Sequence, residues 1–174
     1  WLPDFKYSDD DLAMALSEAP RYSHFALKAL KEMVRQVGTS LLTDINGITR
    51  RGIIIRHLVL PGLVNNSIGV LKLISDNLSP DLHLSLMSQY YPTDKMRTEN
   101  LKSQISDLNL RPSRKLNPEH EVSARKSLGR TITREEYEAV VSSFNDLGFT
   151  RGWLQEYGSH QTYRPDFSRE NPFG

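Results

Sequence analysis

The sequence predicts an α/β fold with about four parallel strands, and two observations support this prediction. Short strand-like segments alternate with longer segments of helical periodicity. The strongest strand-like run, at 52–62, is apolar almost throughout, as in strands of parallel sheets. Strands that alternate with helices are joined by right-handed crossovers. Because four strands cannot close a barrel, the fold is either a small open sheet or the second half of a barrel.

The chain begins with a strand-like segment at 1–7, followed by two helical segments. We expect this beginning to continue an upstream part of a longer protein, and a processed mature N-terminus is the alternative. The acidic and hydroxyl side chains at 8–10 are suited to capping a short helix at 11–18. The segment 21–37 has apolar residues spaced by three and four, and Gly38 is expected to end this helix.

The segment 52–62 is the predicted central strand. Two apolar runs enclose Arg56 and His57, and Pro61 with Gly62 ends the run. We expect both faces of this strand to be buried, where an unpaired charge would be costly. Arg56 therefore either binds an anionic group of a ligand or forms a structural salt bridge. A lone His in a strand, such as His57, is more often a satisfied core residue than a ligand-binding one.

The middle of the chain predicts one more helix and one more strand. Residues 39–51 form a polar connection with a short extended piece at 41–43. Asn65 and Asn66 are expected to cap a helix with an apolar face. The segment 82–90 then predicts a strand in which polar and apolar residues alternate, so one of its faces is expected to be less dry.

The last third of the chain begins with a weakly patterned segment. Residues 91–130 carry more Lys and Arg than Asp and Glu, and we interpret them as a basic insertion. The spacing of Thr133 and Glu136 predicts a capping box at the start of a helix, and a strand follows at 152–157. We assign 1–167 to one domain and 168–174 to an irregular tail.

Composition excludes several classes of protein. The chain of 174 residues has a net charge of +1, which predicts neither a nucleic-acid nor a membrane partner. No apolar stretch is long enough for a membrane span, and no secretory-type leader is visible, so we expect a cytoplasmic protein. The chain contains no cysteine, which excludes disulfides and thiolate metal ligands within it.

Charged residues end the first predicted strand. Asp4 and Lys6 are two residues apart and therefore point to the same side of a strand. In parallel α/β folds ligands bind at the carboxyl ends of the strands. A carboxylate next to an ammonium group suits a zwitterionic ligand, and a same-face ion pair without a ligand is the alternative.

Three motifs together resemble a known family. They are Leu2-Pro-Asp-Phe-Lys-Tyr7, Ile55-Arg-His-Leu-Val-Leu-Pro-Gly62 and Ser85-Leu-Met-Ser-Gln-Tyr90. In this order they are similar to radical SAM proteins related to pyruvate formate-lyase activating enzyme. The resemblance covers residues 1 to about 90 and resumes from 131 to 167.

The resemblance implies the C-terminal part of a partial (β/α)6 TIM-like barrel that binds S-adenosylmethionine beside a [4Fe-4S] cluster. It implies that Asp4 and Lys6 contact the methionine moiety and a nearby cation, and that Arg56 lies near the cofactor. Ser88 stands where the activating enzymes have a cofactor-binding histidine, with Gln89 beside it. The implied cofactor-binding residues are Asp4, Lys6, Arg56, His57, Ser88 and Gln89.

The resemblance implies an oxidoreductase that cleaves S-adenosylmethionine reductively. Its partners would be a glycyl-radical enzyme or other protein substrate and an electron donor such as flavodoxin or ferredoxin. The family holds its cluster on a three-cysteine loop that this chain lacks, so the chain alone is expected to be inactive and carries no predicted catalytic or metal-binding residue. The alternative is a cluster-free domain that binds S-adenosylmethionine or another protein. A barrel hydrolase or aldolase that uses His57 or Lys6 is a weaker third hypothesis.

Overall fold

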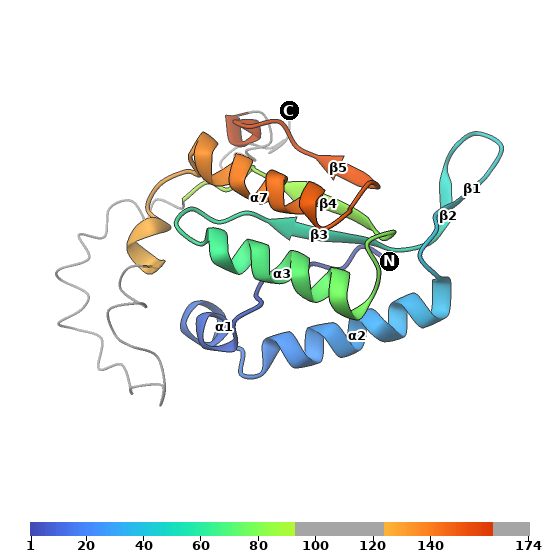
Figure 1. Ribbon diagram of the computed structural model, residues 1–174, viewed down its shortest axis with the longest axis horizontal. Coiled ribbons are helices and arrows are strands. Elements are labelled where there is room, and N and C mark those ends of the chain that lie inside the picture. Colours follow the sequence, from blue (N-terminus) through green and yellow to red (C-terminus); the bar gives the residue numbers. More distant parts are fainter. Residues whose placement is uncertain (93–123, 162–174) are drawn as a thin grey trace, which may run out of the picture.

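A three-stranded parallel sheet lies at the centre of the computed structural model, which describes residues 1–92 and 124–161 (Figure 1). The strands are β3 (Ile54–Leu58), β4 (His83–Met87) and β5 (Gly152–Leu154). They pair in the order β3-β4-β5, which is also their order along the chain. The predicted mixed α/β class and the parallel sheet are therefore confirmed.

The first predicted strand is an irregular parallel segment beside β3. The backbone N–H of Ile54 donates to the carbonyl of Trp1 at 3.1 Å, and that of Arg56 donates to Pro3 at 2.9 Å. The N–H of Phe5 in turn donates to the carbonyl of Arg56 at 3.0 Å. Asp4 and Arg56 are thereby paired directly across the two segments.

The four longest helices of the described residues lie at the predicted helical segments. They are α1 (Asp10–Ser17), α2 (Tyr22–Val37), α3 (Val64–Asn77) and α7 (Arg134–Asp146). The side chain of Asp9 accepts hydrogen bonds from two backbone N–H groups at the start of α1. Thr133 and Glu136 form the predicted capping box of α7.

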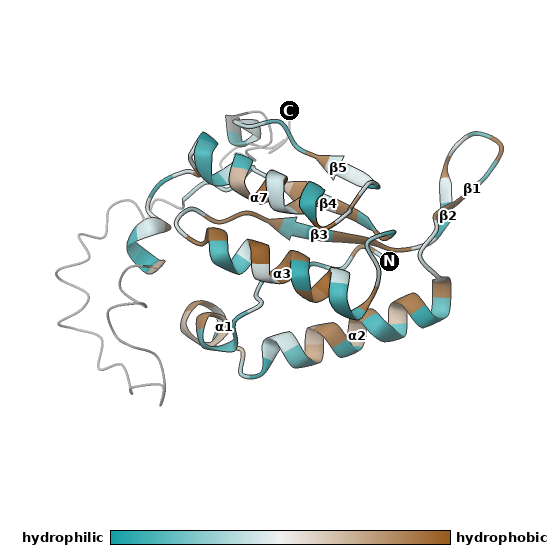
Figure 2. Ribbon diagram, in the orientation of Figure 1, coloured by the Kyte–Doolittle hydropathy of each residue, from teal (hydrophilic) through white to brown (hydrophobic). Residues whose placement is uncertain are grey.

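The helices cover one face of the sheet, so the prediction that β3 is buried on both faces was wrong. Along β3 buried and half-buried residues alternate, and β4 repeats this pattern in register. The core lies between the sheet and the helices α2, α3 and α7. The strands contribute Ile55 and Leu84 to it, and the helices contribute Leu30, Ile74 and Val140. Figure 2 shows that β3 is apolar except for a hydrophilic stretch. The opposite face, which we call the open face, is not covered by these helices.

A hairpin occupies the segment that the sequence suggested was a polar connection. Strand β1 (Leu42–Thr43) pairs antiparallel with β2 (Thr49–Arg51), and the hairpin projects away from the sheet (Figure 1). The carboxylate of Asp44 organises its turn by accepting the N–H groups of Asn46 and Ile48 at 2.9 and 3.0 Å. The Asn46-Gly47 dipeptide is the turn signal that predicts such a hairpin.

Helix α3 is not capped as predicted. Its N-cap residue is Leu63, which makes no side-chain capping bond. Asn66 instead lies buried and reaches the N-terminal segment, where its side chain accepts the N–H of Ser8 at 2.9 Å and donates to the carbonyl of Lys6 at 2.9 Å. The side-chain amide of Asn66, which the local pattern predicts as a helix cap, therefore forms a tertiary contact. This contact fixes the backbone that carries Lys6.

Glu136 connects α7 to the loop that leaves β3. Its carboxylate accepts the backbone N–H groups of Gly62 and Thr133 at 2.8 and 2.9 Å, and the Arg130 guanidinium lies 2.6 Å away. The hydrogen bond from Arg130 lowers the pKa of Glu136 to about 2. We expect Glu136→Gln to lower the free energy of unfolding in urea by about 1–2 kcal/mol, because it weakens a charged cap and the loop contact.

Glu135→Gln is the matched control for this prediction, because Glu135 is exposed in the same first turn of α7. We expect it to change the unfolding free energy by less than about 0.5 kcal/mol. Equal losses in the two variants would contradict the connecting role of Glu136.

Most of the basic insertion at 91–130 and the whole tail at 168–174 lie outside the described residues. At the described end of the insertion, residues 124–127 form a helical turn, and the Arg125 guanidinium donates to the carbonyl of Ala15. Within 1–92 and 124–161, the longest apolar helical stretches fall short of what a membrane crossing requires.

Candidate functional site

The open face of the sheet presents a row of side chains that run across all of its strands. The register pairs Asp4 with Arg56, Arg56 with Ser85, and Ser85 with Trp153. Residues paired in register point to the same face of a parallel sheet. Charged groups therefore lie at one end of the row, the small hydroxyl of Ser85 in the middle and an indole ring at the other end.

The charged end of the row brings together Asp4, Lys6 and Arg56. An Arg56 Nη2 to Asp4 Oδ1 distance of 2.8 Å makes a close ion pair, and Lys6 Nζ lies 4.0 Å from the other carboxylate oxygen. The three side chains are between 36% and 57% exposed, so a ligand can reach each of them. The structure shows Asp4 and Lys6 on the same side, as the sequence predicts. Both the zwitterionic ligand site and the ion pair without a ligand require this placement.

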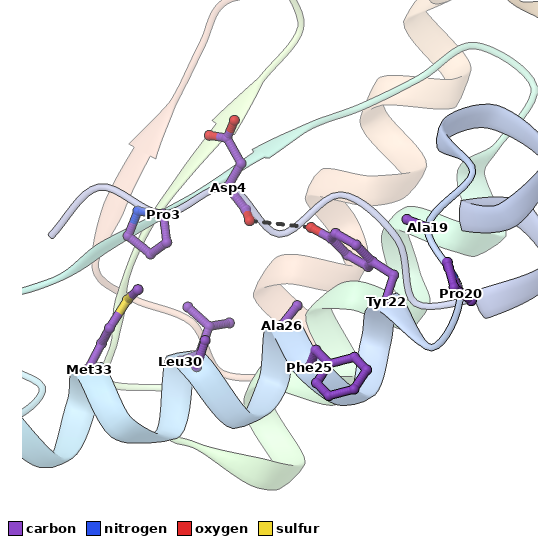
Figure 3. A pocket seen from close by; sticks show the side chains of 10 residues that line it. Pro3, Asp4, Ala19, Pro20, Tyr22, Phe25, Ala26, Leu30 and Met33 are labelled. Carbon is purple, nitrogen blue, oxygen red and sulfur yellow. Dashed lines mark hydrogen bonds between the residues drawn. The ribbon is translucent and has the colours of Figure 1, made fainter.

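The side chain of Tyr22 fixes the backbone of the charged end through two hydrogen bonds. The N–H of Lys6 donates to the Tyr22 hydroxyl at 2.9 Å, and this hydroxyl donates to the Asp4 carbonyl at 3.4 Å. Burial raises the pKa of Tyr22, so the hydroxyl stays protonated and able to donate at neutral pH. Figure 3 shows the Asp4 carboxylate pointing away from Tyr22 and from the helix α2.

A hollow lies between the N-terminal segment and α2, on the other side of this backbone from the Asp4 carboxylate (Figure 3). Its volume is about 400 Å³, and apolar side chains that include Phe25, Leu30 and Met33 line it. Asp4 contributes to its rim, but the carboxylate faces the opposite direction. The charged end of the row and this apolar hollow are therefore separate features.

The charged end contains one carboxylate for two cations. A ligand that brings both an ammonium group and a carboxylate would match it, since the ammonium can share Asp4 while the carboxylate meets Lys6 and Arg56. Arg56 Nε is buried and has no hydrogen-bond partner among the described residues. His83 Nδ1, on the same face two residues from Ser85, is in the same condition. Buried polar atoms are normally paired, so these two nitrogens stand out among the described residues of this face.

His57 does not join the charged group, because it points to the opposite face of β3. It is 2% exposed, and its ring nitrogens contact the Phe5 carbonyl at 2.7 Å and the Ser67 hydroxyl at 2.9 Å. Burial lowers the pKa of His57 to about 4, against a smaller opposing effect of the Phe5 carbonyl. The neutral ring therefore donates from Nδ1 and accepts at Nε2, and both of its nitrogens are used within the core.

Ser88 and Gln89 lie beyond the end of β4 and also stand apart from the charged group. The Ser88 hydroxyl donates to the Glu156 carbonyl at 2.6 Å, and this residue is fully buried. The side chain of Gln155 accepts the Ser88 N–H at 3.0 Å and donates to the Gln89 amide oxygen at 2.8 Å. These bonds fasten β4 to the segment after β5, so the polar groups of Ser88 are occupied.

Sequence reasoning missed three residues of the row and its surroundings. The sequence pattern places His83, Ser85 and Trp153 in strands and assigns none of them to a site. The ring of His83 lies against that of Trp153, with centroids 6.1 Å apart. The alternation along β4 indicates which of its residues share a face, but only the register between β3, β4 and β5 places Ser85 and Trp153 in one row with Arg56.

The residues present do not fit an iron–sulfur cluster. The chain contains no cysteine, and the described residues include no group of three or more His, Asp or Glu placed to hold a metal ion. The charged end does fit the amino acid end of S-adenosylmethionine, which carries one ammonium group and one carboxylate.

Searches of protein-family models, curated proteins and solved structures found no match to the chain.

Proposed function

We propose that the charged end of the row binds the amino acid end of S-adenosylmethionine, in the C-terminal part of a protein related to radical SAM oxidoreductases. The observation that carries the proposal is the convergence of Asp4, Lys6 and Arg56 on one accessible face. The ammonium group of the ligand meets Asp4, and the ligand carboxylate meets Lys6 and Arg56. The chain's own contribution is to bind and orient this end of the ligand.

The winding of the sheet supports the barrel part of the proposal. The strands follow one another in chain order, and α2, α3 and α7 pack in a single core on one side of them. An open doubly wound sheet instead has helices on both faces and reverses its strand order. In a (β/α) barrel the face away from the helices is the interior, so the open face is the interior side of the proposed barrel fragment.

The reductive chemistry belongs to a parent protein that carries the cluster ligands. A [4Fe-4S] cluster would supply the electron for cleavage of the sulfonium, and because this chain has no thiolate to hold one, the parent would have to provide all of its ligands. A glycyl-radical enzyme or other protein substrate and a flavodoxin or ferredoxin remain the partners of the proposed parent. Anaerobic reconstitution of that parent should give cluster absorbance and 5′-deoxyadenosine, and the absence of both would contradict the oxidoreductase.

The binding site itself is tested by calorimetric titration of this chain with S-adenosylmethionine and with methionine alone. We expect Asp4→Asn and Lys6→Ala each to weaken both ligands at least about 10-fold, since each removes one charge-assisted contact. Arg35→Ala is the control, because Arg35 forms an exposed ion pair with Glu32 on α2 at 2.7 Å. Unchanged affinity in the Asp4 and Lys6 variants would contradict the site.

A cluster-free domain that binds S-adenosylmethionine is the second candidate, and the cysteine-free sequence favours it. The two candidates share the binding site but differ in the parent. Binding by this chain together with a parent that forms no 5′-deoxyadenosine would select the second candidate.

A further inference from the structure

The indole end of the row is the part of the open face that the proposed amino acid site does not use. Trp153 is 52% exposed although it belongs to a strand of the central sheet. Large aromatic side chains bury extensive surface when they can, so an exposed ring on a regular strand offers a stacking surface. Its ring contact with His83 supports it from the neighbouring strand.

The position of Trp153 relative to the charged end is set by the sheet. Arg56 and Trp153 are both in register with Ser85, so two strand spacings, roughly 10 Å, separate their backbones. Ser85 is the residue between them, and its side chain is small. A ligand with a zwitterionic tail at one end and a flat ring at the other could lie across the strands and contact both ends.

From this arrangement we infer that Trp153 stacks against the purine ring of an amino-acid-bearing nucleoside whose tail is held by Asp4, Lys6 and Arg56. The inference rests on the proposed function and adds the nucleobase end of the site to it. Stacking between a base and an aromatic side chain is tolerant of the base's edge groups, because every base has a π-face. The ring therefore contributes affinity for a planar base, and the charged end selects the amino acid tail.

The first experiment uses S-adenosylhomocysteine, methionine and adenosine as separate probes for the chain and its Trp153→Leu variant. We expect Trp153→Leu to weaken S-adenosylhomocysteine and adenosine about 10-fold and to leave methionine unchanged. Trp153→Phe, which keeps an aromatic face, should restore most of the affinity. Thermal unfolding of each variant shows whether the sheet is intact.

The second experiment reads the indole directly. The chain has two tryptophans, so in a Trp1→Phe background Trp153 is the only one left. We expect adenosine and S-adenosylhomocysteine to quench its fluorescence and methionine to leave it unchanged. A fluorescence change that follows protein concentration and not ligand would show that Trp153 lies in a contact between copies of the chain, and would overturn the inference.

The probes separate this inference from the proposed function. Binding of methionine and S-adenosylhomocysteine with no effect of Trp153→Leu would overturn the stacking role and leave the amino acid site standing. Adenosine binding that depends on Trp153, without methionine binding, would support the stacking surface and contradict the amino acid site. Failure of all three probes to bind would overturn both.

Discussion

Replacing Gly152 by alanine should be among the most damaging single methyl additions to this chain, with a loss of about 3 kcal/mol in the free energy of unfolding. Gly152 begins β5 with φ +136°, a conformation that side-chain-bearing residues rarely adopt. A β-carbon there would also meet the carbonyl oxygen of Leu84 and lie 2.8 Å from the Leu84 nitrogen. Because these atoms belong to the paired strand β4, they can move only if the β4–β5 pairing is disturbed.

Urea unfolding measures this loss, and Gly148→Ala is the matched control. Gly148 also has a positive φ, of +79°, but an added β-carbon there would meet nothing within 4 Å. We expect this variant to lose about 1 kcal/mol from backbone strain alone. If Gly152→Ala loses no more than Gly148→Ala, the close approach of β5 to β4 is contradicted. The ligand-dependent quenching of Trp153 should also disappear in Gly152→Ala, because β5 carries this ring.

Acid should destabilise the chain through His57 between about pH 6.5 and pH 4. Burial lowers the pKa of this histidine to about 4 in the folded state, whereas the unfolded value is about 6.5. In this window the unfolded state binds more protons, so stability is complete above the unfolded pKa and falls as the pH drops toward the folded one. The difference between the two pKa values corresponds to roughly 3 kcal/mol.

Urea unfolding at a series of pH values between 4 and 7.5 measures this dependence. We expect His57→Gln to be less stable at pH 7, because its side chain cannot repeat both ring contacts, and to show a flatter pH profile. His24→Gln is the control, since it replaces an exposed histidine of α2 that lies outside the core. If the free energy of unfolding of His57→Gln fell with decreasing pH as steeply as that of the unsubstituted chain, His57 would be excluded as the titrating group.

The positions of the helices follow from the local pattern. Capping side chains predicted α1, apolar periodicity predicted α2 and the apolar face of α3, and the Thr133–Glu136 spacing predicted the start of α7. The local pattern was less informative for Asn66, because an amide suited to a helix cap is equally suited to a distant backbone carbonyl. Only the packed chain shows that Asn66 binds the segment that carries Lys6.

The same division holds for the candidate site. Asp4 and Lys6 share a side because they are two residues apart in an extended segment, and this is visible in the sequence. The resemblance placed Arg56 and His57 together in one cofactor site. Adjacent residues of a strand point to opposite faces, and the helix layer covers the His57 side. Arg56 is thereby left on the accessible face, next to Asp4.

The sequence by itself determined the main helices, the parallel α/β class and the charged pair on the first extended segment. Tertiary structure decided which face of the sheet stays open and which residues line it. The physical reason is that periodicity acts within a single element, whereas register joins strands that are far apart in the chain. The pairing of Arg56 with Ser85 and of Ser85 with Trp153 depends on how the helices that connect these strands along the chain pack against the sheet. No local pattern specifies that packing, so only the folded chain shows that the indole lies in the same row as the charged end.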